Sequence, residues 1–147
     1  MERAVFYYSN RSVVFDLFQF QICVYGNECR QHNVRAVVAV LPISDARIWQ
    51  YSNCDDFLSN LTSFCAQSDV PVYDFNLLKT RFQRFNDKTS YENRTHLSGI
   101  GAAQFSLAFC EVMKTADSGK NTDSLFYPSY GDMKKDSPYM ANYSANK

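Results

Sequence analysis

The sequence predicts an α/β domain in which helices cover a small sheet of parallel strands. The first observation is the run VRAVVAVL at residues 34–41, which is apolar on both faces and rich in β-branched residues. Such a run is typical of a central parallel strand covered by helices on each side. The second is the order of segments, because helix-periodic stretches alternate with short apolar runs along the chain. The 147 residues suit one domain of ordinary size.

The N-terminal part contains a short strand candidate and a helix candidate. Residues 4–8 read AVFYY and have the composition of a strand. From Phe15 to Cys29, apolar side chains recur at intervals of three and four. This spacing predicts a helix over residues 12–31, which leads into the strand at 34–41.

A second helix is predicted after that strand. Pro42 ends the strand, and either Asp55 or Asp56 could cap the following helix. The helix carries an apolar stripe formed by Phe57, Leu58, Leu61, Phe64 and Cys65. It ends at Ser68 and Asp69, and residues 70–75 form a second short strand.

The third predicted helix begins at Ser98, which has the character of an N-cap residue. It covers residues 99–114, with Ala102, Phe105, Phe109 and Met113 on one stripe. A helical turn is also possible within residues 77–85. We assign residues 1–115 to the domain and residues 116–147, rich in Ser, Asp, Asn, Lys and Tyr, to a partly disordered polar tail. Residues 125–127 could add a short strand.

Three loop segments are expected to meet at one edge of the sheet. Right-handed crossovers place the carboxyl ends of parallel strands together, and ligands bind at that edge in open α/β folds. The segments that follow the strands or precede the last helix are residues 42–45, 74–76 and 86–97. Ser44, Asp45 and Asp74 are therefore candidate substrate-binding residues, although Asp74 could equally cap a turn.

Composition and charge exclude several classes of protein. Lys plus Arg equals Asp plus Glu at 15 each, so the net charge is zero. This argues against nucleic-acid binding, which depends on neutralising phosphates, and against a polybasic membrane-surface module. No apolar run approaches the ~20 residues needed to cross a bilayer, and residues 1–5 do not resemble a signal peptide. The compartment stays unknown.

Neither a metal site nor a complete set of disulfides is expected. The five cysteines (Cys23, Cys29, Cys54, Cys65 and Cys110) are widely spaced and contain no CxxC pair, so free thiols are the favoured interpretation. The adjacent carboxylates Asp55 and Asp56 suit a helix N-terminus better than a metal. Trp49 and Tyr51 could form an aromatic wall for a substrate, but packing against the protein is the more common role.

His96 is the residue most suggestive of chemistry. It stands in a polar loop just before a helix, at the predicted ligand edge, where an imidazole can act as a general base near neutral pH. The alternative is a loop histidine bonded to backbone. Ser44 and Ser98 are the nearest serines by this argument, but neither lies in a Gly-x-Ser-x-Gly motif, and capping is expected to occupy the Ser98 hydroxyl.

Residues 91–106, which read YENRTHLSGIGAAQFS, resemble the terminal motif of SGNH (GDSL-type) hydrolases. They are most similar to the branch related to the D-alanyl transfer proteins of teichoic acid synthesis, where Asp-x-x-His-Leu-Asn precedes Gly-Ala and Phe-Ser or Phe-Thr. The strand ending VLPI at residues 40–43 and the segments SDVPVYDF at 68–75 and LFYPSY at 125–130 agree with that branch in order. The resemblance extends over residues 14–130.

The resemblance implies a flavodoxin-like parallel sheet and a Ser-His-Asp mechanism of acyl transfer. In that mechanism the histidine takes the serine proton, a carboxylate holds the histidine, and donors stabilise the tetrahedral oxyanion. His96 would be the base, and Asn93 would occupy the position of the acid. The chain departs from the family pattern because it contains no Gly-Asp-Ser motif and because an amide replaces the carboxylate at position 93.

These observations lead to two expected functions. The first is the truncated C-terminal half of an SGNH-like esterase or O-acyltransferase that acts on a cell-surface carbohydrate or another acyl ester and is inactive alone. The second is a non-catalytic binding or scaffold domain that kept the α/β frame. No cofactor or metal is expected. An exposed sheet edge would favour a homodimer or docking to a missing N-terminal half, and the resemblance suggests the cell envelope.

Overall fold

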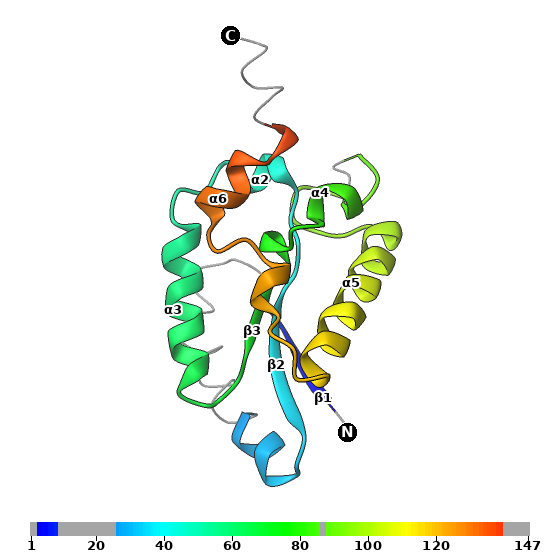
Figure 1. Cartoon of the computed structure of the whole chain (residues 1–147). Coiled ribbons are helices and arrows are strands. Elements are labelled where there is room, and N and C mark those ends of the chain that lie inside the picture. Colours follow the sequence, from blue (N-terminus) through cyan, green and yellow to red (C-terminus); the bar gives the residue numbers. More distant parts are fainter. Residues whose placement is uncertain (1–2, 9–25, 86–87, 140–147) are drawn as a thin grey trace. The chain divides into compact units, whose positions relative to one another are not determined.

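The computed structural model of the chain describes residues 3–8, 26–85 and 88–139, and it is an α/β protein with a small parallel sheet (Figure 1). The chain divides into two compact units that interleave along the sequence. The first comprises Met1–Leu41 and Asp56–Asp74, and the second comprises Pro42–Asp55 and Phe75–Lys147. The units interleave because residues 42–55 group with the C-terminal part of the chain, and the assignment of residues 1–115 to one domain stays a prediction.

The first unit is built on three parallel strands. They are β1 (Arg3–Tyr8), β2 (Arg35–Val40) and β3 (Val72–Asp74), in the order β1-β2-β3. Val5 pairs with Val37, and Val38 pairs with Val72, both in parallel register. Residues 36–40 of the middle strand are all buried, as the run of apolar residues on both faces predicts. The expected parallel arrangement is therefore confirmed for these strands.

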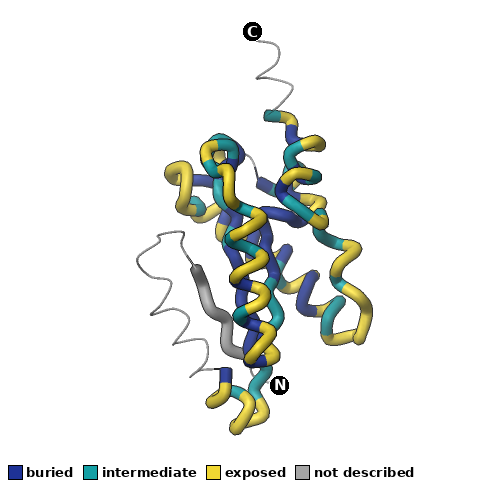
Figure 2. Tube along the Cα trace, turned by 90° about the vertical axis from the view of Figure 1, so that its left-hand side faces the viewer, coloured by how far each residue is buried: buried dark blue, intermediate teal, exposed yellow. Residues whose placement is uncertain are grey.

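Helix α3 (Cys54–Ala66) supplies the apolar layer that packs on β2. Leu61 and Cys65 are buried in one cluster with Ala36, Val38, Val40 and Val70, and Phe57 and Phe64 pack against that cluster. Figure 2 shows the outer side of the helix exposed, and most of β2 and β3 is buried. The apolar stripe thus lies where the sequence periodicity predicts it.

The helical residues 26–31 and helix α3 end in the same way before a strand. Asn33 and Asp69 both adopt a left-handed backbone conformation with φ of 55°, which asparagine and aspartate tolerate better than most residues. The amide of Val34 then donates to the Cys29 carbonyl, and the amide of Val70 donates to the Cys65 carbonyl. Each junction satisfies a terminal helix carbonyl and turns the chain directly into a strand.

The helix predicted over residues 12–31 is only partly within the described residues. Residues 26–31 are helical, and the remainder of the prediction lies outside them.

The second unit contains short helical elements around one long helix. Its elements are α2 (Asp45–Ile48), η2 (Phe75–Leu77), α4 (Arg81–Arg84), α5 (Gly99–Asp117), η3 (Asp123–Leu125) and α6 (Tyr130–Lys135). An aromatic cluster forms its core, in which the Phe75 ring lies 4.9 Å from that of Phe105 and 6.0 Å from those of Phe109 and Phe126. Edge and tilted contacts of this kind are favoured for aromatic pairs.

The prediction that Ser98 caps the last predicted helix is confirmed. The Ser98 side chain accepts a hydrogen bond from the Gly101 amide at 3.1 Å. Phe105 and Met113 of the predicted stripe are buried. The helix continues three residues past the expected end and stops before Gly119, whose φ of 72° suits glycine.

Within the expected polar tail at residues 116–147, the described residues 116–139 belong to the second unit and include η3 and α6. Ser129 caps α6 by accepting from the Asp132 amide, and Tyr130 and Met133 are buried. The segment folds because its few apolar residues are spaced to enter the core, a feature hidden by its polar average composition. The strand suggested at residues 125–127 is a single antiparallel bridge between Leu78 and Phe126.

No helix in the described ranges is long and apolar enough to cross a bilayer.

Candidate functional site

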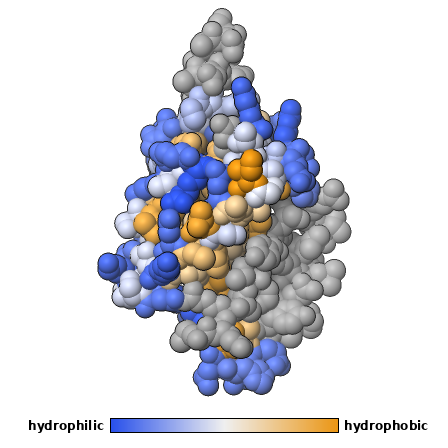
Figure 3. Space-filling model, turned by 90° about the vertical axis from the view of Figure 1, so that its right-hand side faces the viewer, coloured by the Kyte–Doolittle hydropathy of each residue, from blue (hydrophilic) through white to orange (hydrophobic). Residues whose placement is uncertain are grey.

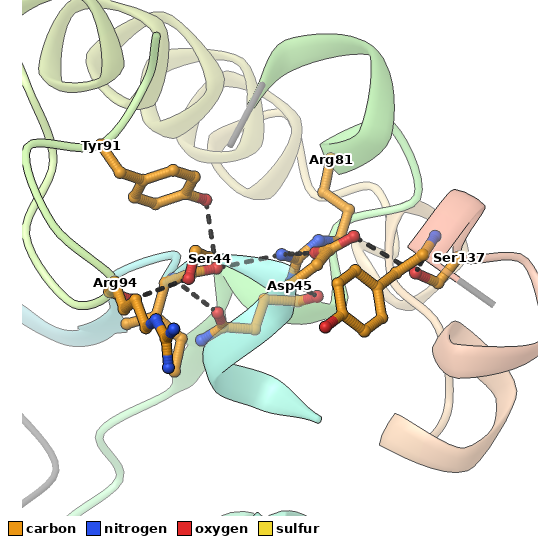
Figure 4. Close-up of polar contacts among 9 residues, drawn as sticks. Ser44, Asp45, Arg81, Tyr91, Arg94 and Ser137 are labelled. Carbon is orange, nitrogen blue, oxygen red and sulfur yellow. Dashed lines mark hydrogen bonds and ion pairs between the residues drawn. The ribbon is translucent and has the colours of Figure 1, made fainter. Parts of the chain in front are cut away.

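The loops expected at the ligand edge contact one another within the second unit. The Ile43 amide donates to Asn76 Oδ1 at 2.9 Å, and the Tyr91 hydroxyl donates to the Ile43 carbonyl at 3.1 Å. The Ser44 amide donates to the Arg94 carbonyl at 3.2 Å. The segment after β2, the start of the segment after β3 and the loop before α5 thus form one hydrogen-bonded cluster (Figure 4).

Ser44 is buried in this cluster with 4% of its surface exposed. Its hydroxyl donates to the Arg94 carbonyl at 3.1 Å. The amide and the hydroxyl of Ser44 therefore tie the start of α2 to the loop before α5. This contact suits a structural role for Ser44. A nucleophilic serine would bond to the His96 ring, but among the described residues the Ser44 hydroxyl is bonded to the Arg94 carbonyl.

Asp45 forms a buried ion pair with Arg81. Its Oδ1 atom lies 2.5 Å from a terminal nitrogen of Arg81, whose side chain is 1% exposed. Its Oδ2 atom accepts from the Ser137 hydroxyl at 3.2 Å. Arg81 also donates to the carbonyls of Asn76 and Ile43 at 2.7 and 3.1 Å. The Asp45 carboxylate therefore connects α2 with α4 and with Ser137, which follows α6.

Arg81 and Ser137 are the site residues that sequence reasoning missed. Arg81 lies in a polar segment where only a helical turn was expected, and Ser137 lies in the expected tail. The apolar neighbours Phe82 and Phe85 are a weak sign that Arg81 could be buried. A buried arginine needs a carboxylate partner, and sequence spacing does not reveal which distant carboxylate that is.

Asp74, the third candidate for substrate binding, belongs to the first unit. It is the last residue of β3 and has only 4% of its surface exposed.

The structure brings the two candidate catalytic residues together. Asn93 Oδ1 lies 2.9 Å from His96 Nδ1 and accepts from the backbone amides of Thr95 and His96 at 2.9 and 3.0 Å. An amide oxygen can only accept, so Nδ1 must carry the hydrogen of this bond. The neutral ring then has its lone pair on Nε2. The Thr95 hydroxyl lies 3.1 Å from the same Nδ1.

The loop that carries this pair is closed at its base. Tyr91 and Leu97 form an antiparallel bridge, and the Glu92 amide donates to the His96 carbonyl at 2.9 Å. Below them, Ser98 donates its hydroxyl to the Thr89 carbonyl at 2.6 Å. His96 itself is exposed. The arrangement presents an oriented imidazole to solvent at the N-terminal end of α5.

The hydroxyl of Ser98 both caps α5 and bonds to the loop before it. It donates to Thr89 and accepts from Gly101. The prediction that the helix cap occupies this hydroxyl is confirmed.

The remaining sequence candidates have structural partners. Asp55 Oδ1 accepts from the Tyr130 amide at 2.7 Å, which places it at the start of α6. The Trp49 ring stacks on Tyr139 at 5.9 Å, and the Lys134 ammonium lies 5.4 Å from the Trp49 ring centre. These contacts favour packing over an open aromatic wall. The described residues hold no group of three or more His, Cys, Asp or Glu side chains arranged to share a metal ion.

A separate hollow of about 620 Å³ lies in the first unit. It is lined by the residues just before and within the amino ends of β2 and β3, such as Val34, Arg35 and Val70, together with Arg30 and Thr62. It is therefore at the amino ends of these strands, away from the edge where the sequence predicts a ligand.

Comparison with protein-family models, with curated proteins and with solved structures finds no significant match for this chain.

Proposed function

We propose that this chain is the base-carrying, C-terminal part of an SGNH-like esterase or O-acyltransferase with a flavodoxin-like sheet. Its substrate would be an acyl ester, such as an acylated cell-surface carbohydrate. The observation that carries the proposal is the 2.9 Å contact between Asn93 Oδ1 and His96 Nδ1. The contact joins the two positions at which the resembled motif has its acid and its base.

His96 would act through Nε2. A base in this position takes the proton of an attacking hydroxyl and later returns it to the leaving group. Asn93 holds the tautomer that leaves the Nε2 lone pair ready for this step. An amide carries no charge, so it orients the ring without stabilising the imidazolium as a carboxylate does.

The nucleophile would come from another segment or another chain. The hydroxyls of Ser44 and Ser98 are both bonded to loop carbonyls, and the 147 residues contain no Gly-Asp-Ser motif. Without that nucleophile, His96 itself would react with activated esters. Its Nε2 attacks the ester carbonyl, the alcohol or phenol leaves, and water then cleaves the acyl-imidazole to release the acid.

The test measures hydrolysis of p-nitrophenyl acetate by the whole chain and by His96→Ala. The chain has only one other histidine, His32, which is also exposed, so His32→Ala is a matched control. We expect the rate above buffer to be lost in His96→Ala and kept in His32→Ala. Equal losses, or no loss in His96→Ala, would contradict the role of His96.

A second arm tests the contribution of Asn93. Asn93→Asp restores the charge of the resembled motif, and we expect the rate to rise about tenfold or more, since a carboxylate stabilises the imidazolium. In Asn93→Ala, nitrogen chemical shifts of the His96 ring should show that the preference for a hydrogen on Nδ1 is lost. Unchanged ring shifts in Asn93→Ala would show that Asn93 does not set the tautomer.

The burial of Ser44 and Asp45 favours a second candidate, a non-catalytic binding or scaffold domain. These two candidate substrate-binding residues are bonded inside the second unit, to Arg94 and Arg81 respectively. Such a domain would show no dependence of ester hydrolysis on His96, so the same assay separates the two functions.

A further inference from the structure

Helix α5 exposes an apolar stripe to solvent. Ile100 and Leu107 are 58% and 64% exposed, and they are the exposed large hydrophobic side chains of the described residues. Ala103 and Cys110 are also exposed, and the four positions follow one another at intervals of three, four and three. That spacing places them on one side of the helix, and Figure 3 shows apolar side chains gathered on this face.

The opposite side of α5 is already used. Phe105, Ala108, Val112 and Met113 are buried, so the side of α5 that packs in the described part of the second unit is not the side that carries the exposed stripe. A contiguous exposed apolar stripe bordered by polar side chains is a feature of interaction surfaces. Here the border consists of Gln104, Ser106 and Glu111, and Glu111 is paired with Arg84 at 2.5 Å.

We propose that the stripe formed by Ile100, Ala103, Leu107 and Cys110 packs against the same stripe of a second copy, with the two helices antiparallel. A two-fold axis near residue 105 brings Ile100 opposite the partner's Cys110 and Ala103 opposite the partner's Leu107. Each large side chain then faces a smaller one, which is the arrangement that lets two helices approach and interdigitate. The stripe is thus complementary to itself, as a two-fold interface requires.

The charges beyond the stripe favour the antiparallel direction. The C-terminal part of α5 carries Lys114 and Asp117, and the exposed loop before its N-terminus carries Glu92 and Arg94. Antiparallel pairing brings the C-terminal end of one helix to the loop of the other, so Lys114 approaches the partner's Glu92 and Asp117 approaches the partner's Arg94. Parallel pairing would instead bring the two Lys114 side chains together, and like charges oppose association.

The composition of α5 argues against a membrane as the occupant. Amphipathic helices that lie on membranes carry several Lys or Arg residues on the polar face, whereas Lys114 is the one basic residue of α5, alongside the acidic Glu111 and Asp117. The stripe is also smaller than the roughly 20–30 residues per side of a stable protein interface. We therefore expect weak pairing that depends on protein concentration.

The test is a disulfide crosslink in the whole chain. Ile100→Cys places a thiol opposite the partner's Cys110, so mild oxidation should give a covalent dimer several times more abundant than in wild type. Two native Cys110 residues would be ten positions apart along the paired helices, about 15 Å at 1.5 Å per residue, which is too far for a disulfide. Ser106→Cys, an exposed position beside the stripe, is the matched control.

Peptide mapping must find the bridge between positions 100 and 110, and Leu107→Lys added to Ile100→Cys must abolish it while circular dichroism stays unchanged. A crosslink no more abundant than in Ser106→Cys would overturn the proposal, as would a bridge joining the two Cys110 residues. Cosedimentation of the unmodified chain with anionic vesicles, without a crosslinked dimer, would assign the stripe to a membrane and also overturn it. None of these outcomes bears on the ester-hydrolysis assay of His96.

Discussion

The carboxylate of Asp45 and the guanidinium of Arg81 form an ion pair across 36 sequence positions, with a separation of 2.5 Å. The Arg81 side chain is 1% exposed and that of Asp45 is 12% exposed. The pair connects the segment after β2 with α4, and the Ser137 hydroxyl completes it from the C-terminal segment. The start of α2, which carries the buried Ser44, therefore depends on a cation supplied from a distant part of the chain.

Arg81→Met should strongly destabilise the second unit. It leaves the Asp45 carboxylate buried without its cation and removes the donors to the Asn76 and Ile43 carbonyls. Breaking a buried pair in this way costs about 3–5 kcal/mol of unfolding free energy, which urea denaturation followed by Trp49 fluorescence can measure. The exposed pair of Arg84 with Glu111 is the control, because Arg84→Met should cost at most about 1 kcal/mol.

The double variant Asp45→Asn with Arg81→Met refines this prediction. Removing both charges should cost less than the sum of the two single changes, because no unpaired charge stays buried. Additive losses would show that the two side chains act independently.

Gly101→Ala should disturb the junction between α5 and the loop that carries His96. A Cβ atom at Gly101 would lie 1.9 Å from the Ser90 carbonyl oxygen and 2.8 Å from its carbon, so backbone must move. We expect a loss of about 1–3 kcal/mol in unfolding free energy. Gly99→Ala is the matched control, since its Cβ would meet nothing within 4 Å and alanine favours the helix. Equal effects of the two substitutions would contradict the close approach.

The hydroxyl of Tyr127 should keep its proton to higher pH than an exposed tyrosine does. Burial raises the pKa of Tyr127 above its ordinary value of 10.0, and the hydrogen bond and charge of Asp136 raise that pKa further, against a smaller lowering by Arg81. Because the pKa of Tyr127 is higher in the folded chain than in the unfolded chain, the stabilising contribution of its protonated hydroxyl is fully present below pH 10.0. It is lost as the pH rises through the folded pKa.

Absorbance at 295 nm, taken as the difference between wild type and Tyr127→Phe, isolates this ionisation from that of the other tyrosines. Asp136→Asn should move the ionisation to lower pH. If Asp136→Asn leaves the alkaline transition where it is, the contact between Tyr127 and Asp136 does not hold the proton.

Local interactions explain which elements could be predicted from the sequence. The strand within residues 34–41, the stripe of α3 and the Ser98 cap depend on side chains within a few positions of one another, so periodicity and capping chemistry reveal them. Asn93 and His96 are three positions apart, and their proximity also follows from local spacing. The segments that follow β2 and β3 contact each other through Ile43 and Asn76, as the handedness of parallel crossovers leads one to expect.

Tertiary structure alone decided the rest. The partner of Asp45 is Arg81, the ring against Trp49 belongs to Tyr139, and Ser137 lies 92 positions from the carboxylate that it contacts. Residues 123–135 fold although their composition is that of a tail, because a few apolar side chains find a core made by distant residues. The spacing of residues along the chain does not predict such pairs, because their contacts form only when packing brings separate segments together.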